Sequence, residues 1–215
     1  MHTKLYMLLL CLLPFMANAV ETTAKQAIVI DYQTGIELYA KDADVPVAPS
    51  SMSKLMLLYM VFDALESGRV KLDTPMLISE KAWRKGGSKM FIRVGDQVKL
   101  EDLLRGVIVQ SGNDACIAIA ENLAGSEEVF SEQMNIMARK LGLNNTYLVN
   151  ATGWPDSRHV MSVRDIAKLS EYLIKHFPQY YHYFGEQSFT YNNITQPNRN
   201  FLLGKLGVDG LKTGH

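Results

Sequence analysis

The sequence predicts an α+β fold, with strands near both ends of the chain and helices between them. Short apolar runs lie next to turn residues near the start and the end, whereas segments of helical length fill the middle. The composition, with 47% hydrophobic and 20% charged residues among 215, is typical of a globular domain with a substantial core. We expect the terminal strands to share one sheet.

The strand predictions depend on short apolar runs bounded by turn residues. Gln33, Thr34 and Gly35 separate the first two runs, which is the pattern of a β-hairpin. Two weaker runs follow in the first half of the chain, and two more lie near its end. The predicted strands are residues 27–31, 36–39, 76–79, 97–100, 188–191 and 208–213.

The helix predictions depend on longer apolar or periodic segments. Residues 55–62 are almost continuously apolar, so the helix that contains them should be buried on most of its faces and should stop near Gly68. Glu101 and Asp102 lie at the start of another helix, where acidic side chains suit the positive end of the helix dipole. The predicted helices are residues 55–68, a helix that begins at residue 100, and residues 113–123, 126–141 and 163–176.

The first 19 residues are typical of a secretory signal peptide. A cationic start at Lys4 precedes an apolar run over residues 5–16, and Ala17 and Ala19 supply the small residues before a cleavage site. The run is too short to cross a bilayer as a mature helix. We therefore expect cleavage after Ala19, which leaves residues 20–215 as the mature, exported chain.

Charge and cysteine content argue against a protein that binds nucleic acid or anionic lipid through a basic surface, and against a fold stabilised by disulfides. Lys plus Arg and Asp plus Glu number 22 each, so the chain lacks the basic field that attracts nucleic acid or anionic lipid. Cleavage of the signal peptide would remove Cys11 and leave Cys116, and one cysteine cannot form an internal disulfide. Because Cys116 lies in an apolar segment, we expect a buried structural thiol.

Ser51 and Lys54 form the first of three polar groups in otherwise apolar surroundings. Three residues apart on a helix, they would share one face at its start, where free backbone N–H groups can stabilise an oxyanion. Burial would lower the pKa of the Lys54 amine toward the range in which it acts as a base. Taken alone, such a pair more often marks a capped helix with a lysine that extends to solvent.

Two further polar groups follow along the chain. Ser111 and Asn113 lie between two apolar runs, which indicates either a buried loop whose side chains are used or the N-cap of the next helix. Lys212, Thr213 and Gly214 follow the last strand-like run. They offer a charge for a carboxylate, a hydroxyl and room for another backbone, so an extended peptide could pair there. The alternative is an exposed strand end.

The order Ser-x-x-Lys, Ser-x-Asn, Lys-Thr-Gly resembles the serine penicillin-recognising enzymes, which comprise penicillin-binding proteins and serine β-lactamases. More of the chain is similar to the low-molecular-mass D-alanyl-D-alanine carboxypeptidases. The similar stretches are residues 48–54, 110–116, 150–153, 155–156, 161–165 and 208–215. The resemblance covers essentially the whole mature chain. It implies a β-lactamase/transpeptidase-like α+β fold, in which helices flank an antiparallel sheet beside a helical subdomain.

The resemblance also implies a reaction. Ser51 would be the nucleophile that forms an acyl-enzyme, Lys54 would accept its proton, and Ser111 would relay a proton to the departing D-alanine. The substrate would be a peptidoglycan stem peptide that ends in D-Ala-D-Ala, and β-lactams would acylate the same serine. The enzyme would act in the periplasm. We expect no metal or other cofactor, since no His-Glu-x-x-His set is present.

The other motif residues would bind the substrate, according to the resemblance. They are Asn113, Lys212, Thr213, Gly214 and His215. Asn113 would hold Lys54 and the substrate amide, and Lys212 and Thr213 would bind the terminal carboxylate. The backbone N–H groups of the nucleophile and of His215 would form an oxyanion hole, where loss of one donor typically costs ~10²–10³ in rate.

The residues favour a carboxypeptidase over a class A β-lactamase. No Glu-x-x-x-Asn loop lies between Leu143 and Arg164, and Gly112 stands where that class has Asp in its second motif. Transpeptidation stays open, because it differs only in the acceptor that reaches the acyl-enzyme. Two alternatives are a pseudoenzyme that binds stem peptides or β-lactams, and a general secreted peptidase or esterase. The last lacks support, since the sequence has neither a Gly-x-Ser-x-Gly elbow nor an evident His triad with Ser51.

The sequence ends at His215, directly after the third motif. The resemblance implies further strands beyond that point, and commonly a β-rich domain and an amphipathic tail that anchors the protein to the inner membrane. We therefore expect residues 20–215 to be part of a catalytic domain, with a sheet incomplete at the C-terminus and a bare last strand. A terminal carboxylate near Lys212 would compete for the substrate pocket, so the chain as written is expected to be inactive.

Overall fold

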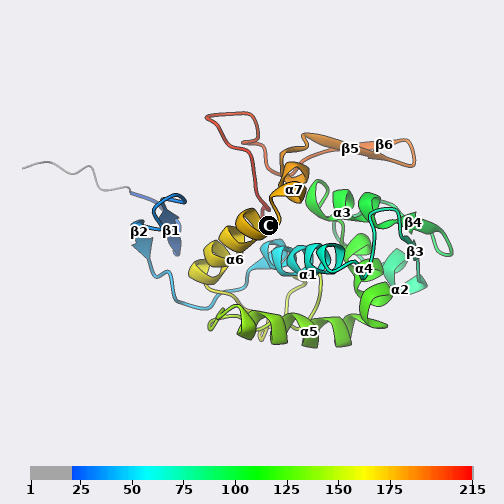
Figure 1. Ribbon diagram of the computed structural model, residues 1–215, viewed down its shortest axis with the longest axis horizontal. Helices are drawn as coiled ribbons and strands as arrows, with labels where there is room; N and C mark the ends of the chain where they lie inside the picture. The colour runs from blue at the N-terminus through cyan, green and yellow to red at the C-terminus, as the bar shows by residue number, and fades with distance from the viewer. Residues whose placement is uncertain (1–20, 215) are drawn as a thin grey trace, which may run out of the picture.

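The computed structural model describes residues 21–214, and Figure 1 shows a group of helices with three β-hairpins around it. Helix α1 runs through the middle, and α5 and α6 pack against it. The helices are α1 (Lys54–Glu66), α2 (Glu80–Arg84), α3 (Leu100–Ile108), α4 (Asn113–Ala124), α5 (Glu127–Lys140), α6 (Val163–His176) and α7 (Pro178–Tyr181), with 3₁₀ turns η1 (Ser50–Ser53) and η2 (His182–Gly185). The signal peptide expected over residues 1–19 lies outside the described residues.

Helix α1 is the centre of the core, as its continuous apolar sequence predicts. Leu55 and the residues after it as far as Leu58 are at most 1% exposed, and α4, α5 and α6 contact the helix. A helix this apolar is stable only when neighbours cover most of its circumference. The burial begins at the first residue of the helix, Lys54, which is 0% exposed.

Serine side chains begin three of the helices. Ser79, Ser126 and Ser162 each accept a hydrogen bond from the backbone N–H three residues later, at 3.0, 3.1 and 3.1 Å. These caps satisfy N–H groups that a helix leaves free at its first turn, so each helix starts at a defined residue. The helix predictions that are confirmed to within one residue at both ends are 113–123, 126–141 and 163–176.

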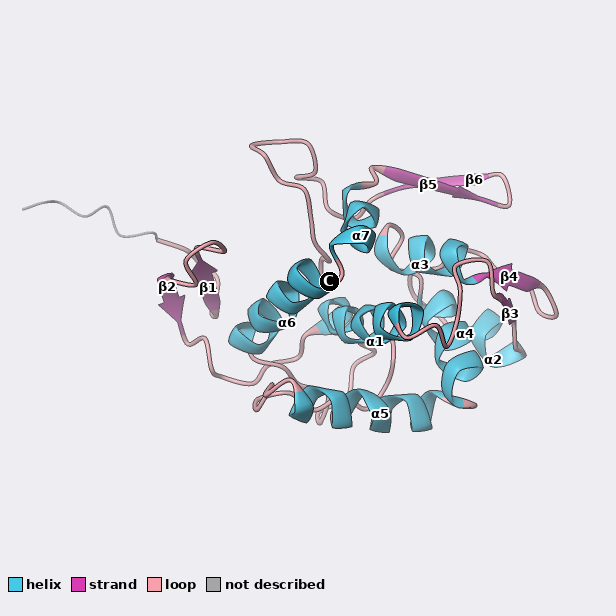
Figure 2. Cartoon of the chain, in the orientation of Figure 1, coloured by secondary structure: helices cyan, strands magenta, loops and turns pink. Residues whose placement is uncertain are grey.

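The strands form three separate two-stranded antiparallel hairpins (Figure 2). They are β1 (Ala27–Ile30) with β2 (Glu37–Lys41), β3 (Pro75–Leu77) with β4 (Gln97–Lys99), and β5 (Ser188–Tyr191) with β6 (Ile194–Pro197). The α+β class and the first five strands are confirmed. The prediction that the terminal strands share one sheet is wrong for the described residues, in which β1 pairs with β2 alone.

The strand predicted over residues 208–213 is also wrong for the described residues, because the segment takes part in no strand pairing there. Side chains hold it instead of a β-ladder. The Tyr181 hydroxyl donates to Asp209 Oδ1 at 2.9 Å, and Asn200 Nδ2 donates to the carbonyl of Gly210 at 2.8 Å. A strand needs a neighbouring strand to bond with, and a local apolar pattern does not supply one.

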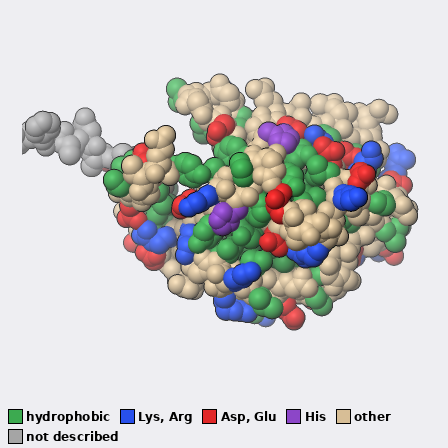
Figure 3. Space-filling model, viewed as in Figure 1, with side chains coloured by type: hydrophobic (Ala, Val, Ile, Leu, Met, Phe, Trp, Pro, Cys, Tyr) green, Lys and Arg blue, Asp and Glu red, His purple; other side chains and the backbone are tan. Residues whose placement is uncertain are grey.

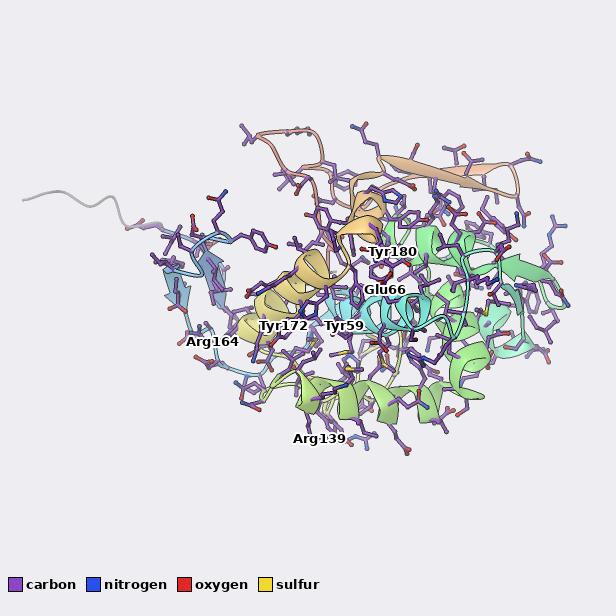
Figure 4. All side chains as sticks on the ribbon, viewed as in Figure 1. Tyr59, Glu66, Arg139, Arg164, Tyr172 and Tyr180 are labelled. Carbon is purple, nitrogen blue, oxygen red and sulfur yellow. The ribbon has the colours of Figure 1, made fainter. Side chains whose placement is uncertain are left out.

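Three short elements have no counterpart among the sequence predictions, namely α2, α7 and β6. In α7, the Tyr180 hydroxyl donates to Glu66 Oε1 at 3.1 Å, at the last residue of α1 (Figure 4). The Tyr180 ring also stacks on Phe62 of α1, with 4.9 Å between centroids. Contacts with α1 therefore hold α7 in place, and the sequence of α7 alone does not indicate them.

Charged side chains of both signs are interspersed on the face that Figure 3 shows. Arg164, at the start of α6, pairs with Asp44 at 2.8 Å and with Glu37 of β2, which ties the first hairpin to the helical body (Figure 4). This mixture agrees with the balanced composition. Within residues 21–214, none of the helices has the length and apolarity that a bilayer span requires.

Candidate active site

Ser51 and Lys54 lie together where η1 passes into α1. Ser50 has a φ of 48°, in the left-handed region, and begins this turn. Lys54 Nζ lies 2.9 Å from Ser51 Oγ. The hydroxyl and the amine are therefore within the distance at which a proton can pass directly between them. The predicted shared face of these two residues is confirmed.

The Lys54 side chain is 0% exposed, and its Nζ contacts three oxygen atoms. Besides Ser51 Oγ, these are Asn113 Oδ1 at 2.9 Å and the carbonyl oxygen of Thr152. None of the ion pairs within residues 21–214 involves this amine. Burial therefore dominates, and it lowers the pKa of Lys54 from its ordinary value.

The same contacts decide how a neutral Lys54 amine is oriented. The Thr152 carbonyl can only accept a hydrogen bond, and Asn113 turns its Oδ1 toward Lys54 because its Nδ2 donates to the Gly86 carbonyl at 2.9 Å. A neutral amine has two N–H groups and one lone pair. When both N–H groups are engaged by these oxygens, the lone pair faces the Ser51 hydroxyl. The arrangement is thus suited to remove a proton from Ser51.

Ser111 and Asn113 come from the turn between α3 and α4. Ser111 has a φ of 59°, a strained conformation that persists only where the surroundings enforce it. The Asn113 N–H donates to the Ser88 carbonyl at 2.7 Å, and the Asp114 carboxylate accepts the Met90 N–H at 3.0 Å. No side chain caps α4. The second motif is therefore a buried loop, and the alternative of a side-chain N-cap is wrong.

Lys212, Thr213 and Gly214 lie next to the first motif. A Cβ on Gly214 would be 3.3 Å from the Pro49 carbonyl, so the two backbones pass close to each other. Lys212 is 7% exposed, and its Nζ donates to the Thr213 carbonyl at 2.9 Å. Burial, reinforced by the charge of Lys54, lowers the pKa of Lys212 to about 7.

The three motifs meet at one cavity with a volume of ≈ 510 Å³. Its lining residues are Ser51, Ser88, Ser111, Arg199, Phe201, Thr213 and Gly214. The sequence predictions missed Ser88, Arg199 and Phe201. Arg199 and the 70% exposed Phe201 follow β6, and no local pattern connects them to the motifs. His215, the remaining predicted site residue, lies outside the described residues.

The loop of residues 150–154 completes the site, although its sequence carries no evident catalytic side chain. Thr152 supplies the carbonyl that contacts Lys54. A Cβ on Gly153, which has a φ of 77°, would be only 2.0 Å from the Ser50 carbonyl oxygen. Both the conformation and the space therefore require glycine there. The loop supports the Ser51 turn and the Lys54 amine at once.

The Cys116 thiol is not a second nucleophile. It is 0% exposed, and burial raises its pKa to about 12, so it stays protonated at neutral pH. The predicted buried structural thiol is confirmed. Within residues 21–214, no cluster of three or more His, Cys, Asp or Glu side chains is arranged to hold a metal ion.

Comparison with known sequences identifies extended similarity. A family model described as D-alanyl-D-alanine carboxypeptidase matches residues 14–215. The D-alanyl-D-alanine carboxypeptidase DacC of Escherichia coli (strain K12) is 42% identical over 205 residues, which are 92% of this chain and 51% of that protein. DacF of Bacillus subtilis (strain 168) is 36% identical over 202 residues, which are 89% of this chain and 51% of that protein. The chain spans about half the length of these curated relatives.

Solved structures show the same fold. Penicillin binding protein 5 from Haemophilus influenzae superimposes with a TM-score of 0.88 at 39% identity, over 91% of this chain and 58% of that chain. Penicillin-Binding Protein D2 from Listeria monocytogenes, in its ampicillin-bound form, gives a TM-score of 0.81 at 28% identity, over 91% and 80% of the two chains. The β-lactamase/transpeptidase-like α+β fold that the motifs imply is thereby confirmed.

Proposed function

The chain belongs to the D-alanyl-D-alanine carboxypeptidase family, and on that basis we propose that it removes the terminal D-alanine from peptidoglycan stem peptides through an acyl-enzyme on Ser51. The observation that carries the proposal is the 2.9 Å contact between the Ser51 hydroxyl and the buried Lys54 amine, at the cavity where the three motifs meet. β-Lactams acylate the same serine, a proposal in line with the ampicillin-bound form of the Listeria monocytogenes relative.

Acylation begins with the transfer of a proton from Ser51 to Lys54. As the lone pair of the neutral amine accepts this proton, Oγ forms a bond to the carbonyl carbon of the penultimate D-alanine. The carbonyl oxygen becomes an oxyanion. The backbone N–H of Ser51 is suited to stabilise it, because N–H groups in the first turn of a helix lack intrahelical partners. The family resemblance assigns the second donor to His215.

Ser111 and Asn113 take part in the breakdown of this tetrahedral intermediate. The C–N bond to the terminal D-alanine breaks, and its nitrogen takes a proton from Lys54 through the Ser111 hydroxyl, which lines the cavity. Asn113 Oδ1 keeps Lys54 in place during this transfer, and Asn113 Nδ2 has a second N–H beyond the one that contacts Gly86. Water then hydrolyses the ester on Ser51 and releases the shortened peptide.

The terminal carboxylate of the substrate binds at the third motif. Lys212 is buried without an ion-pair partner within residues 21–214, and Thr213 and Gly214 line the cavity beside it. Arg199 lines the same cavity, and its positive charge adds to burial and to the charge of Lys54 in lowering the pKa of Lys212, so the two cations repel each other. An anionic group relieves this repulsion, which favours a peptide with a free carboxyl end.

Binding of such a peptide is expected to weaken as the pH rises above about 7, the pKa to which burial lowers Lys212. Above that pH the free site loses the Lys212 charge, and a carboxylate must bind together with a proton. The KM for a D-Ala-D-Ala peptide should rise by up to roughly tenfold per pH unit. The same peptide with a C-terminal amide is the matched control, and its KM should not follow this rise. A flat KM for the acid would contradict the assignment of Lys212.

The proposal is tested by incubation of the full chain with a fluorescent penicillin, followed by denaturation and peptide mass spectrometry. We expect a stable adduct on Ser51 that Ser51→Ala lacks. Rapid loss of the label would indicate a β-lactamase. A chain that is folded by circular dichroism but carries no adduct would overturn the proposal for this chain, and would indicate either a pseudoenzyme or a site blocked near Lys212.

We further propose that residues 1–19 direct export to the periplasm and that residues 20–215 contribute the site-bearing part of a catalytic domain. The coverage of 58% and 80% of the two solved relatives supports the second statement. Fusion of residues 1–25 to a reporter enzyme that is active only in the periplasm tests the first. Reporter activity that requires these residues is expected, and activity retained only in the cytoplasm would contradict export.

A further inference from the structure

We propose that Asn150 is a positioning residue for this reaction, which directs the lone pair of Lys54 toward Ser51 by holding the Thr152 carbonyl in place. The inference depends on the proposed function, because it takes Lys54 as the base. Asn150 acts through the loop of residues 150–154 and not through a contact of its own with the nucleophile.

The Asn150 side chain organises this loop through several hydrogen bonds. Its Oδ1 accepts the backbone N–H groups of Thr152 at 3.1 Å, Gly153 at 2.8 Å and Trp154 at 3.0 Å. The same atom accepts the Thr152 hydroxyl at 3.0 Å, and Nδ2 donates to the Trp154 carbonyl at 3.0 Å. One side chain therefore gathers the N–H groups of consecutive residues, as asparagine does in tight turns.

The position of the Thr152 carbonyl follows from the planarity of the peptide bond. In a trans peptide, the C=O and the N–H point in opposite directions. The peptide that joins Thr152 to Gly153 directs its N–H to Asn150, so its carbonyl points away from Asn150 and meets Lys54 Nζ. Without the Asn150 acceptor, the Gly153 N–H loses its hydrogen-bond partner, and the carbonyl is held on the amine less firmly.

Other buried side chains hold the neighbouring part of the loop. Glu127, at the start of α5, accepts the Ala151 N–H at 3.1 Å. Asn135 of α5 makes two hydrogen bonds to the backbone of Leu148. Its Nδ2 donates to the Leu148 carbonyl at 2.6 Å, and its Oδ1 accepts the Leu148 N–H at 2.8 Å. These contacts do not depend on Asn150. Its replacement should therefore loosen one peptide unit while the loop stays attached to α5.

The sign of the pH effect follows from the chemistry of the carbonyl. An acceptor stabilises the protonated amine more than the neutral one, so its loss lowers the pKa of Lys54 further. The maximal acylation rate falls as well, because the lone pair is no longer held on the Ser51 hydroxyl. The titratable groups that interact electrostatically with Lys54 are unchanged by the substitution, and they are Lys85, Cys116, His159 and Lys212.

The experiment measures acylation by a fluorescent penicillin as a function of pH. Asn150→Ala is expected to lower the plateau rate roughly tenfold and to move the acidic limb of the profile to lower pH by roughly one unit. Asn150→Asp keeps an oxygen acceptor and should restore most of the plateau. Asn144→Ala is the matched control, because Asn144 is exposed and its side chain makes no hydrogen bond within the described residues. It should behave like the wild type.

A second measurement does not require turnover. The chemical shifts of ¹³C-labelled lysine side chains report the pKa of Lys54 directly, which should be lower in Asn150→Ala than in the wild type. An unmoved acidic limb and an unchanged Lys54 pKa in a folded variant would overturn the inference, and so would a uniform fall in rate without either shift. If Asn150→Ala does not fold, Asn150→Ser is held to the same criteria. A wild-type chain without an adduct on Ser51 would count against the proposed function, whereas the lysine titration would still decide the effect of Asn150.

Discussion

Replacement of Lys54 with methionine is expected to slow acylation of Ser51 by roughly 10²- to 10⁴-fold. Methionine has a similar unbranched shape and suits a position that is 0% exposed, but it has no group that accepts a proton at neutral pH. The Ser51 hydroxyl would keep its proton and remain a weak nucleophile. The measurement is the second-order rate constant for labelling by a fluorescent penicillin, with circular dichroism to establish that the variant is folded.

Lys140→Met is the matched control for this prediction. Lys140 is exposed at the last residue of α5, so its replacement should leave labelling unchanged. If a folded Lys54→Met variant is labelled at nearly the wild-type rate, another group takes the proton. Lys212 would then be the first candidate, since burial lowers its pKa to about 7, a value that suits a general base.

Local patterns predicted the helices well because the determinants of a helix lie within its own sequence. Helix α6 (Val163–His176) begins after the capping residue Ser162, and its predicted limits are correct. Strand pairing depends on a distant partner, so the apolar run over 208–213 did not indicate whether a ladder forms. Strand β6 could have been predicted, because the pair Asn192 and Asn193 is typical of a hairpin turn. In the structure both residues have positive φ values, 47° and 60°.

In the site, too, the sequence predicted the local features and missed those that depend on distant segments. Ser51 and Lys54 were predicted because a recognisable motif consists of side chains at a fixed spacing. The carbonyl that contacts Lys54 is a main-chain atom, which every residue possesses, so residue type cannot mark it. The local signal that was present is Asn150 shortly before Gly153, a pattern that favours an Asx turn. Arg199 reaches the cavity from the segment after β6, and only the tertiary structure connects it to the motifs.

Gly153→Ala is expected to lower the free energy of unfolding by about 2–5 kcal/mol and to slow acylation by roughly 10²-fold. The added Cβ would lie 2.0 Å from the Ser50 carbonyl oxygen and 2.9 Å from Ser53 Oγ, and an L-residue is strained at a φ of 77°. Main-chain atoms of η1 or of the loop would have to move, and Ser51 would move with them. Chemical denaturation measures the stability, and penicillin labelling measures the acylation.

Gly125→Ala measures the conformational cost of a positive φ without the steric collision that a Cβ causes at Gly153. Gly125 has a φ of 82°, and a Cβ there would meet nothing within 4 Å, so this variant should lose only about 1–2 kcal/mol and should acylate normally. The difference between the two variants measures how firmly the loop of residues 150–154 and the Ser50 turn hold each other. Equal losses would mean that the turn yields freely to an added methyl group. A loop so easily displaced could not fix Ser51 and Lys54 relative to each other, and the alignment of base and nucleophile would need another source.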